Sequence, residues 1–113
     1  MLPKQHRLRR AVDFRTVLRS GRRVRVRYFQ MHLLGGTGRP ARLGLVVGGK
    51  VGNSVQRHRI SRQVREGVRP ALADFAGHDL VIRALPGAAG LSNLEIRSQI
   101  AGLVAAGRVS HES

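Results

Sequence analysis

A chain of 113 residues with 42% hydrophobic side chains can build one modest core, which excludes a wholly disordered basic tail. Its formal net charge of +15 is concentrated in residues 1–70, which hold 18 of the 21 basic residues and two acids. Charge this uneven is typical of a binding surface for a polyanion, with nucleic acid the first candidate and a membrane surface the second. The absence of Cys excludes disulfides, thiolate metal sites and Cys nucleophiles.

The first half of the chain predicts an arm, a helix and strands. Residues 1–10 form a basic arm that we expect to be extended, and Ala11–Ser20 is predicted to be a short helix that ends before Gly21. Residues 22–34 alternate Arg with Val and then become more apolar, which predicts a strand that a break can divide into two. The apolar run 43–47 is predicted to be a buried strand.

The second half predicts a helix, a strand and a last helix. Asn53 with Gln56 forms a capping box, so a helix is expected to begin there and to run to about Phe75. Residues 80–85 are predicted to be a strand. A second capping box opens the last helix, which we expect to end at Gly107 and to leave residues 108–113 frayed.

This order of elements predicts one α+β domain, residues 1–113, built as a two-layer sandwich. Strand 43–47, the helix and strand 80–85 form a βαβ pattern, so the two strands are expected to be parallel. From the pattern alone the crossover would be right-handed.

The helix after Asn53 has two different faces. Ile60, Val64, Val68 and Ala71 recur at helical spacing and predict a face in the core. A second set of basic residues follows the same period on another face: His58, Arg62, Arg65 and Arg69, flanked by Arg57 and Arg59. Glu66 is the one acid in this segment, so we favour a surface for phosphates over a solvated charged face.

No arrangement of residues indicates a catalytic site in the chain itself. The five His residues have no metal-ligand spacing, and Asp13, Asp74 and Asp79 are explained as a helix acid, a surface residue and a turn former. The residues favour a protein that binds RNA while a partner carries out catalysis. Three alternatives stay open: a ribosomal or other structural RNA-binding protein, a DNA-compacting basic protein, and a nuclease that uses a His.

The run from Lys50 to Arg65 resembles the signature helix of the bacterial ribonuclease P protein subunit. Arg57 and Arg59 match the two arginines of the family's Arg-Asn-Arg core, with His58 at the usual Asn position. Lys50, Gly52 and Val55 match the preceding turn, and Ser61 stands where the family often has Lys. The residues that the resemblance and the basic face assign to the RNA subunit are Lys50, Asn53, Arg57, His58, Arg59, Arg62, Arg65 and Arg69.

The resemblance also implies a fold and a function. The fold would be that of the second domain of ribosomal protein S5, in the order α-β-β-β-α-β-α with a left-handed βαβ crossover. The protein would bind the catalytic RNA and assist endonucleolytic removal of the 5′ leader from precursor tRNA. Mg²⁺ would be held mainly by the RNA subunit and the substrate and none by the protein alone. The compartment would be the cytoplasm, with no membrane and no protein partner required.

A second surface is expected between the first helix and the sheet. Aromatic and apolar side chains beside cations can hold single-stranded RNA without reading its sequence. In the family this cleft binds the 5′ leader, and Phe14 matches a cleft aromatic, whereas Leu18 and His32 stand at positions that are often aromatic. The residues assigned to the cleft are Phe14, Arg15, Leu18, Tyr28 and His32, while for Phe29 we favour a place in the core.

Overall fold

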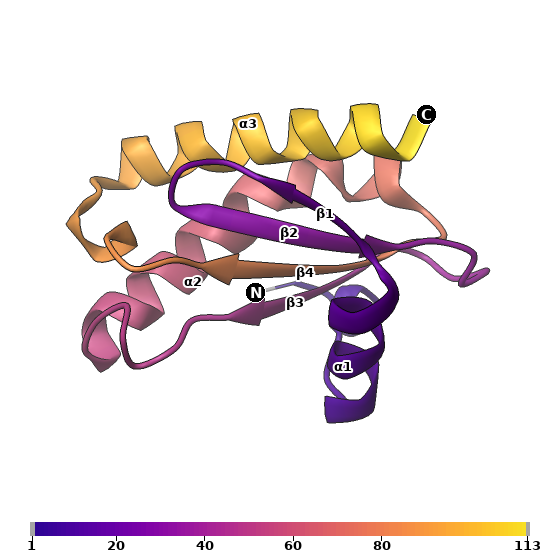
Figure 1. Ribbon diagram of the computed structural model, residues 1–113, viewed down its shortest axis with the longest axis horizontal. Helices are drawn as coiled ribbons and strands as arrows, with labels where there is room; N and C mark the ends of the chain where they lie inside the picture. Colours follow the sequence, from indigo (N-terminus) through magenta and orange to yellow (C-terminus); the bar gives the residue numbers. More distant parts are fainter. Residues whose placement is uncertain (1, 113) are drawn as a thin grey trace.

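The computed structural model describes the backbone of residues 2–112 and the side chains of residues 2–109. Its helices and strands follow one another along the chain as shown in Figure 1. They are α1 (Ala11–Ser20), β1 (Arg22–Arg25), β2 (Phe29–Leu34), β3 (Arg42–Val46), α2 (Ser54–Val68), β4 (Asp79–Ala84) and α3 (Asn93–Glu112), with short 3-10 helices at Lys4–His6, Arg69–Phe75 and Ala88–Gly90.

The four strands form one mixed sheet in the order β1-β2-β4-β3. β3 pairs in parallel with β4, which confirms the prediction from the βαβ pattern. β2 pairs antiparallel with β1 and with β4. The predicted break divides β1 from β2 at a tight turn, which the bond from the Val26 N–H to the Phe29 carbonyl closes at 2.9 Å. The α+β class is therefore confirmed.

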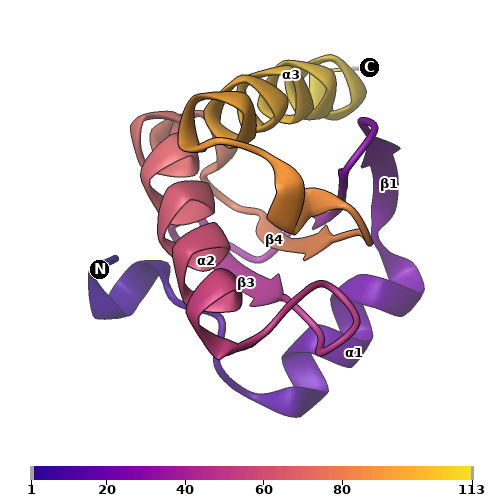
Figure 2. The same cartoon turned by 90° about the vertical axis from the view of Figure 1, so that its left-hand side faces the viewer.

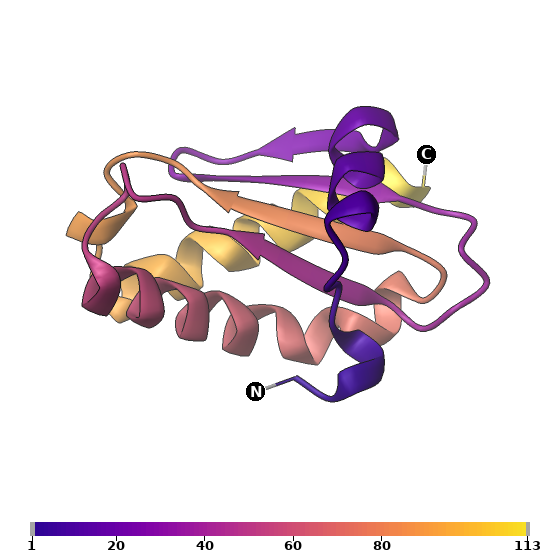
Figure 3. The same ribbon diagram turned by 90° about the horizontal axis from the view of Figure 1, so that it is seen from below.

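Helices lie on both faces of the sheet (Figure 2). α2 and α3 cover one face, where Phe29, Met31 and Leu33 of β2 share one buried cluster with Ile60 and Val64 of α2 and with the inner side chains of α3. This is the main core, and it confirms both the apolar face of α2 and the place of Phe29. α1 covers one end of the opposite face with a smaller cluster around Val17 and Val81 (Figure 3).

The arm is docked on the domain, so the expectation of an extended arm is wrong for its middle. Lys4–His6 forms a 3-10 turn, and Leu2 and Leu8 are buried. The Leu8 N–H donates to the Leu43 carbonyl at 3.0 Å, which attaches the arm to the edge strand β3. The physical reason is the two leucines, because burying them stabilises a compact arm. Met1, also assigned to the arm, lies outside the described residues.

Of the two predicted helix ends in the second half, the first is confirmed in position and the second is wrong. The α-helix α2 ends at Val68, because Pro70 cannot donate a backbone hydrogen bond, and a 3-10 helix continues the segment to Phe75, where the end was predicted. α3 passes through Gly107 and continues to Glu112, so residues 108–112 are helical, while Ser113 lies outside the described residues. Gly107 is buried against Met31 and Phe75, where a Cβ would meet the Met31 side chain. This glycine allows close packing and does not end the helix.

Candidate nucleic-acid interface

The start of α2 is fixed by the predicted capping box. The Asn53 side-chain oxygen accepts from the Gln56 N–H at 2.9 Å, and the Asn53 N–H donates to Gln56 Oε1 at the same distance. Ile60, Val64 and Val68 are fully buried on the inner side of the helix. Both constraints leave α2 with one fixed rotation about its axis, so its outer side chains are presented in a defined pattern.

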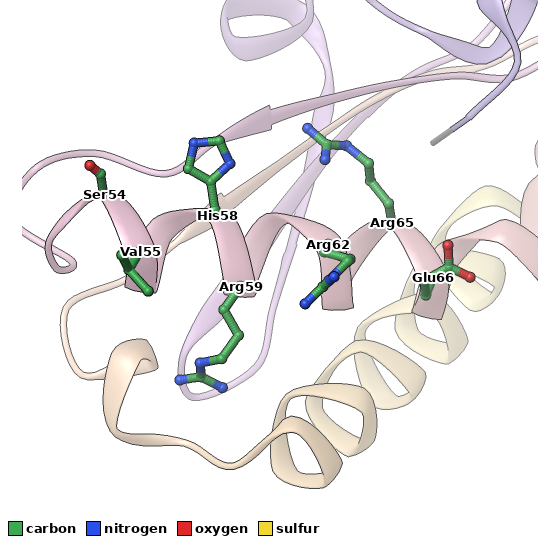
Figure 4. Close-up of a pocket in the computed structure, with 7 residues that line it drawn as sticks. All are labelled: Ser54, Val55, His58, Arg59, Arg62, Arg65 and Glu66. Atoms are coloured by element: carbon green, nitrogen blue, oxygen red, sulfur yellow. The ribbon is translucent and has the colours of Figure 1, made fainter.

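A shallow hollow of about 750 Å³ lies along the outer side of α2 (Figure 4). It is lined by Ser54, Val55, His58, Arg59, Arg62, Arg65 and Glu66. The side chains of His58, Arg62 and Arg65 are exposed and form no hydrogen bond or ion pair with any residue that the structure describes. We name these three residues the α2 ridge. Their cationic and polar groups remain available for a partner.

The other predicted RNA-subunit residues have different surroundings. Arg59 donates to Asn93 Oδ1 at 2.8 Å and to the Ala89 carbonyl at 3.0 Å. Arg69 pairs with Glu66 at 3.0 Å. Arg57 is half-buried beside β3, and its Nε has no partner within the described residues. Lys50 is exposed in the turn before α2.

On the other face of the sheet, α1 approaches very closely. The Phe14 ring lies directly over Gly44 of β3, where a Cβ on that glycine would overlap the ring. Phe14 and Leu18 pack against the cluster of Val17 and Val81 and remain half-buried. The structure therefore brings two of the five predicted cleft residues together at the base of α1.

The sheet surface beside α1 is basic. In register across the strands, Arg23 lies opposite His32, while Gln30 lies between Arg25 and Arg83. His32 is only 9% exposed, and burial lowers its pKa from the ordinary value, with Arg83 and Arg23 lowering it further. The imidazole therefore favours its neutral form, and the arginines supply the charge.

Two predicted cleft residues lie apart from this surface, and one of the arginines on it was missed. Tyr28 precedes β2 and packs against the main core and Gly87. Its ring centroid lies 5.3 Å from the guanidinium carbon of Arg27. Arg15 is exposed on α1. Arg83 was not singled out, although the alternation within strand 80–85 could have placed it opposite the core face.

Comparison with known proteins decides the family. The family model for Ribonuclease P matches residues 2–106. Curated relatives named "Ribonuclease P protein component" include one from Acidothermus cellulolyticus, 46% identical over 88% of this chain and 85% of that protein, and one from Mycobacterium sp. strain KMS, 40% identical over 88% and 87%. The chain belongs to the ribonuclease P protein family.

Solved structures agree with this assignment. The Staphylococcus aureus ribonuclease P protein has a TM-score of 0.86 at 25% identity, over 94% of this chain and 98% of that one. The Thermotoga maritima ribonuclease P protein, solved with 1-(4-fluorophenyl)-2-thiourea, has a TM-score of 0.78 at 25% identity, over 87% and 96%. The chain is thus the RNA-binding protein subunit of an endoribonuclease that removes the 5′ leader from precursor tRNA.

The Asp side chains of this chain are paired with arginines. Asp79 is buried and accepts from Arg42 Nε at 2.9 Å and Nη2 at 2.8 Å, so its assignment as a turn former is wrong. This bond raises the pKa of the Arg42 guanidinium. Asp13 lies 3.2 Å from Arg10 and 3.7 Å from Arg42. Within the side chains that the structure describes, no three His, Asp or Glu residues gather as a metal site.

No helix within residues 2–112 is both long and apolar enough to cross a bilayer.

Proposed function

We propose that the ribonuclease P protein uses two separate surfaces for two RNAs. The α2 ridge binds the catalytic RNA, and the surface beside α1 holds the 5′ leader of the precursor. The observation that carries the proposal is the α2 ridge itself: three exposed side chains with no partner in the described chain, on a helix whose opposite face is locked in the core.

The ridge suits a folded RNA. Guanidinium groups form two parallel hydrogen bonds to a phosphate, and a helix of fixed rotation holds them at a constant spacing. Arg62 and Arg65 supply the charge, and His58 supplies a ring that both donates and accepts. The remaining assigned residues extend this surface at its ends: Lys50, Asn53, Arg57, Arg59 and Arg69.

The surface beside α1 suits a flexible strand. At the edge of this surface, Phe14 offers an aromatic ring and Leu18 adds apolar area for a base. His32 lies in the floor of this surface, opposite Arg23 in the register and near enough to Arg83 to feel its charge. Both arginines can contact the phosphates of a strand placed there. Arg15 adds a separate charge on the exposed side of α1, and Tyr28 with Arg27 offers a separate stacking position at the far end of β2. Stacking and phosphate contacts of this kind tolerate any sequence.

We further propose that Mg²⁺ is held by the RNA subunit and the substrate. The acids Asp13 and Asp79 both contact Arg42, and such paired acids are poor ligands for Mg²⁺. The proposed compartment is the cytoplasm, where bacterial precursor tRNA is made. The similarity to the S. aureus protein supports a left-handed β3-α2-β4 crossover as in the second domain of ribosomal protein S5.

The ridge is tested with the double variant Arg62→Ala/Arg65→Ala. Its affinity for the RNA subunit should fall, and the slope of log K against log salt should become shallower by about 0.7–0.9 for each lost phosphate contact. The matched control is Arg97→Ala/Arg108→Ala, which removes the same charge from α3. If the ridge variant and the control bind the RNA subunit equally well, the ridge is only a solvated face.

A further inference from the structure

The docked arm creates another basic hollow, of about 760 Å³, that none of the α2 residues lines. Six of the side chains around it are cationic and one is acidic. The lining consists of Lys4, Gln5, Arg7, Arg9, Arg10, Asp13, Arg39, Pro40 and Arg42. We name this hollow the arm site. Among these described lining residues Pro40 is the one apolar side chain, so the hollow offers charge and hydrogen-bond donors but no platform for a base or a lipid chain.

The arm site is held in place by backbone and buried contacts. The His6 ring donates from Nδ1 to the Ala41 carbonyl at 2.7 Å, and the Arg7 backbone forms an isolated parallel β-bridge with Leu43 of β3. Leu2 and Leu8 are buried on either side of these contacts. The basic side chains between the two leucines therefore project from a fixed backbone and keep a constant spacing.

The acids nearby neutralise only part of this charge. Asp13 contacts Arg10 and Arg42, and Asp79 contacts Arg42 and Arg39. The side chains of Lys4, Arg7 and Arg9 have no hydrogen bond or ion pair with the part of the chain that the structure describes. Arg7 is further evidence for a bound anion, because its Nε is buried without a hydrogen-bond acceptor among the described residues. A buried donor of this kind is satisfied when an anion binds beside it.

We propose that the arm site binds backbone phosphates of an RNA strand, as a contact separate from the α2 ridge and from the surface beside α1. Guanidinium groups recognise phosphate oxygens directly, and a hollow without aromatic side chains reads no base. The contact is therefore independent of sequence and sensitive to salt. The inference rests on the proposed function only in taking the catalytic RNA and the precursor tRNA as the RNAs present.

The experiment compares Lys4→Ala/Arg9→Ala with the control Arg97→Ala/Arg108→Ala. The side chains of Lys4 and Arg9 are exposed and hold no other described residue, so the variant should fold, which circular dichroism and thermal melting verify first. One assay measures protein binding to the RNA subunit, and a second assay measures holoenzyme binding to precursor tRNA, each over a salt series. In one assay or both, the variant should bind more weakly than the control. Its slope of log K against log salt should be shallower by about 1.4–1.8 for two lost phosphate contacts.

The two assays identify the source of the phosphates. A loss of affinity confined to the first assay assigns the arm site to the RNA subunit, and a loss confined to the second assay assigns it to the precursor. If the variant binds as tightly as the control in both assays, the proposal is overturned. The α2 ridge variant measured in parallel keeps the two proposals distinguishable, because a loss there with none at Lys4 and Arg9 rejects the arm site alone.

Discussion

Arg59 Nη1 of α2 donates a hydrogen bond of 2.8 Å to Asn93 Oδ1 at the start of α3. Its Nη2 donates at 3.0 Å to the Ala89 carbonyl in the preceding turn. Arg59 therefore ties two segments that lie far apart in the sequence, while the side chain of Arg62, one turn further on, has no partner in the described chain. Two arginines that look equivalent in the helical pattern have different physical roles.

This difference predicts different effects on stability. Arg59→Ala should lower the free energy of unfolding by about 1–3 kcal/mol, because it removes two hydrogen bonds worth roughly 0.5–1.5 kcal/mol each. Arg62→Ala should change it by less than about 0.5 kcal/mol, as is usual for an exposed side chain without contacts. Urea unfolding of both variants measures the two values. Equal stabilities would show that the bonds of Arg59 contribute nothing net.

The buried pair of Asp79 and Arg42 should be a larger source of stability. Asp79→Asn leaves the guanidinium of Arg42 without its carboxylate in a site where the side chains are 6% and 17% exposed. Breaking such a pair should cost about 3 kcal/mol. The control is Asp74→Asn, which breaks the exposed pair with Arg108 and should cost less than about 1 kcal/mol. Similar midpoints in urea for the two variants would contradict the importance of burial here.

His32 should make stability depend on pH. Its pKa in the folded protein lies below the ordinary value of 6.5, so the unfolded chain takes up a proton first as the pH falls. Protonation of the unfolded state favours unfolding, and stability is therefore lost as the pH drops from 6.5 towards the lowered pKa. Above 6.5 this contribution to stability is complete.

The measurement uses the variant His32→Gln, which cannot titrate. The free energy of unfolding is determined at about pH 7.5 and about pH 5.5, on either side of the ordinary His value. The wild-type protein should lose more stability between the two than the variant. An equal loss in both proteins would mean that other groups account for the whole pH effect.

Local patterns in the sequence predicted the helices, the strands and their order along the chain well. The capping box at Asn53 and the spacing of Ile60 and Val64 depend on neighbours within a few residues, so the order of residues alone is enough to predict them. The parallel pairing of β3 with β4 followed from the helix between them. Patterns of this range also located the α2 ridge.

Contacts between distant residues could not be predicted in the same way. The partners of Arg59 lie 34 and 30 residues away, and Asp79 accepts from an arginine 37 residues away. Neither periodicity nor composition carries such pairings. The docking of the arm on β3 is of the same kind, because Leu2 and Leu8 look like isolated apolar residues until the edge strand lies beside them.

The surface beside α1 gives the last prediction. The Phe14 ring is half-buried over Gly44, so part of it lies in the core and part of it remains open to solvent. If a base of the 5′ leader stacks there, Phe14→Ala should weaken holoenzyme binding to precursor tRNA by roughly 1–3 kcal/mol. Mature tRNA has no leader, so its affinity should change little. Binding of both ligands to the variant holoenzyme measures the difference.

The controls must separate stacking from folding, because Phe14 also fills part of the small core. Phe14→Leu keeps most of the apolar volume without the aromatic face, so it should be the more stable variant yet should still bind the precursor weakly. Thermal melting establishes that each variant is folded under the binding conditions. If folded Phe14→Leu binds precursor as tightly as the wild type, then Phe14 contributes packing alone. A loss that is equal for precursor and mature tRNA would place its role outside the leader.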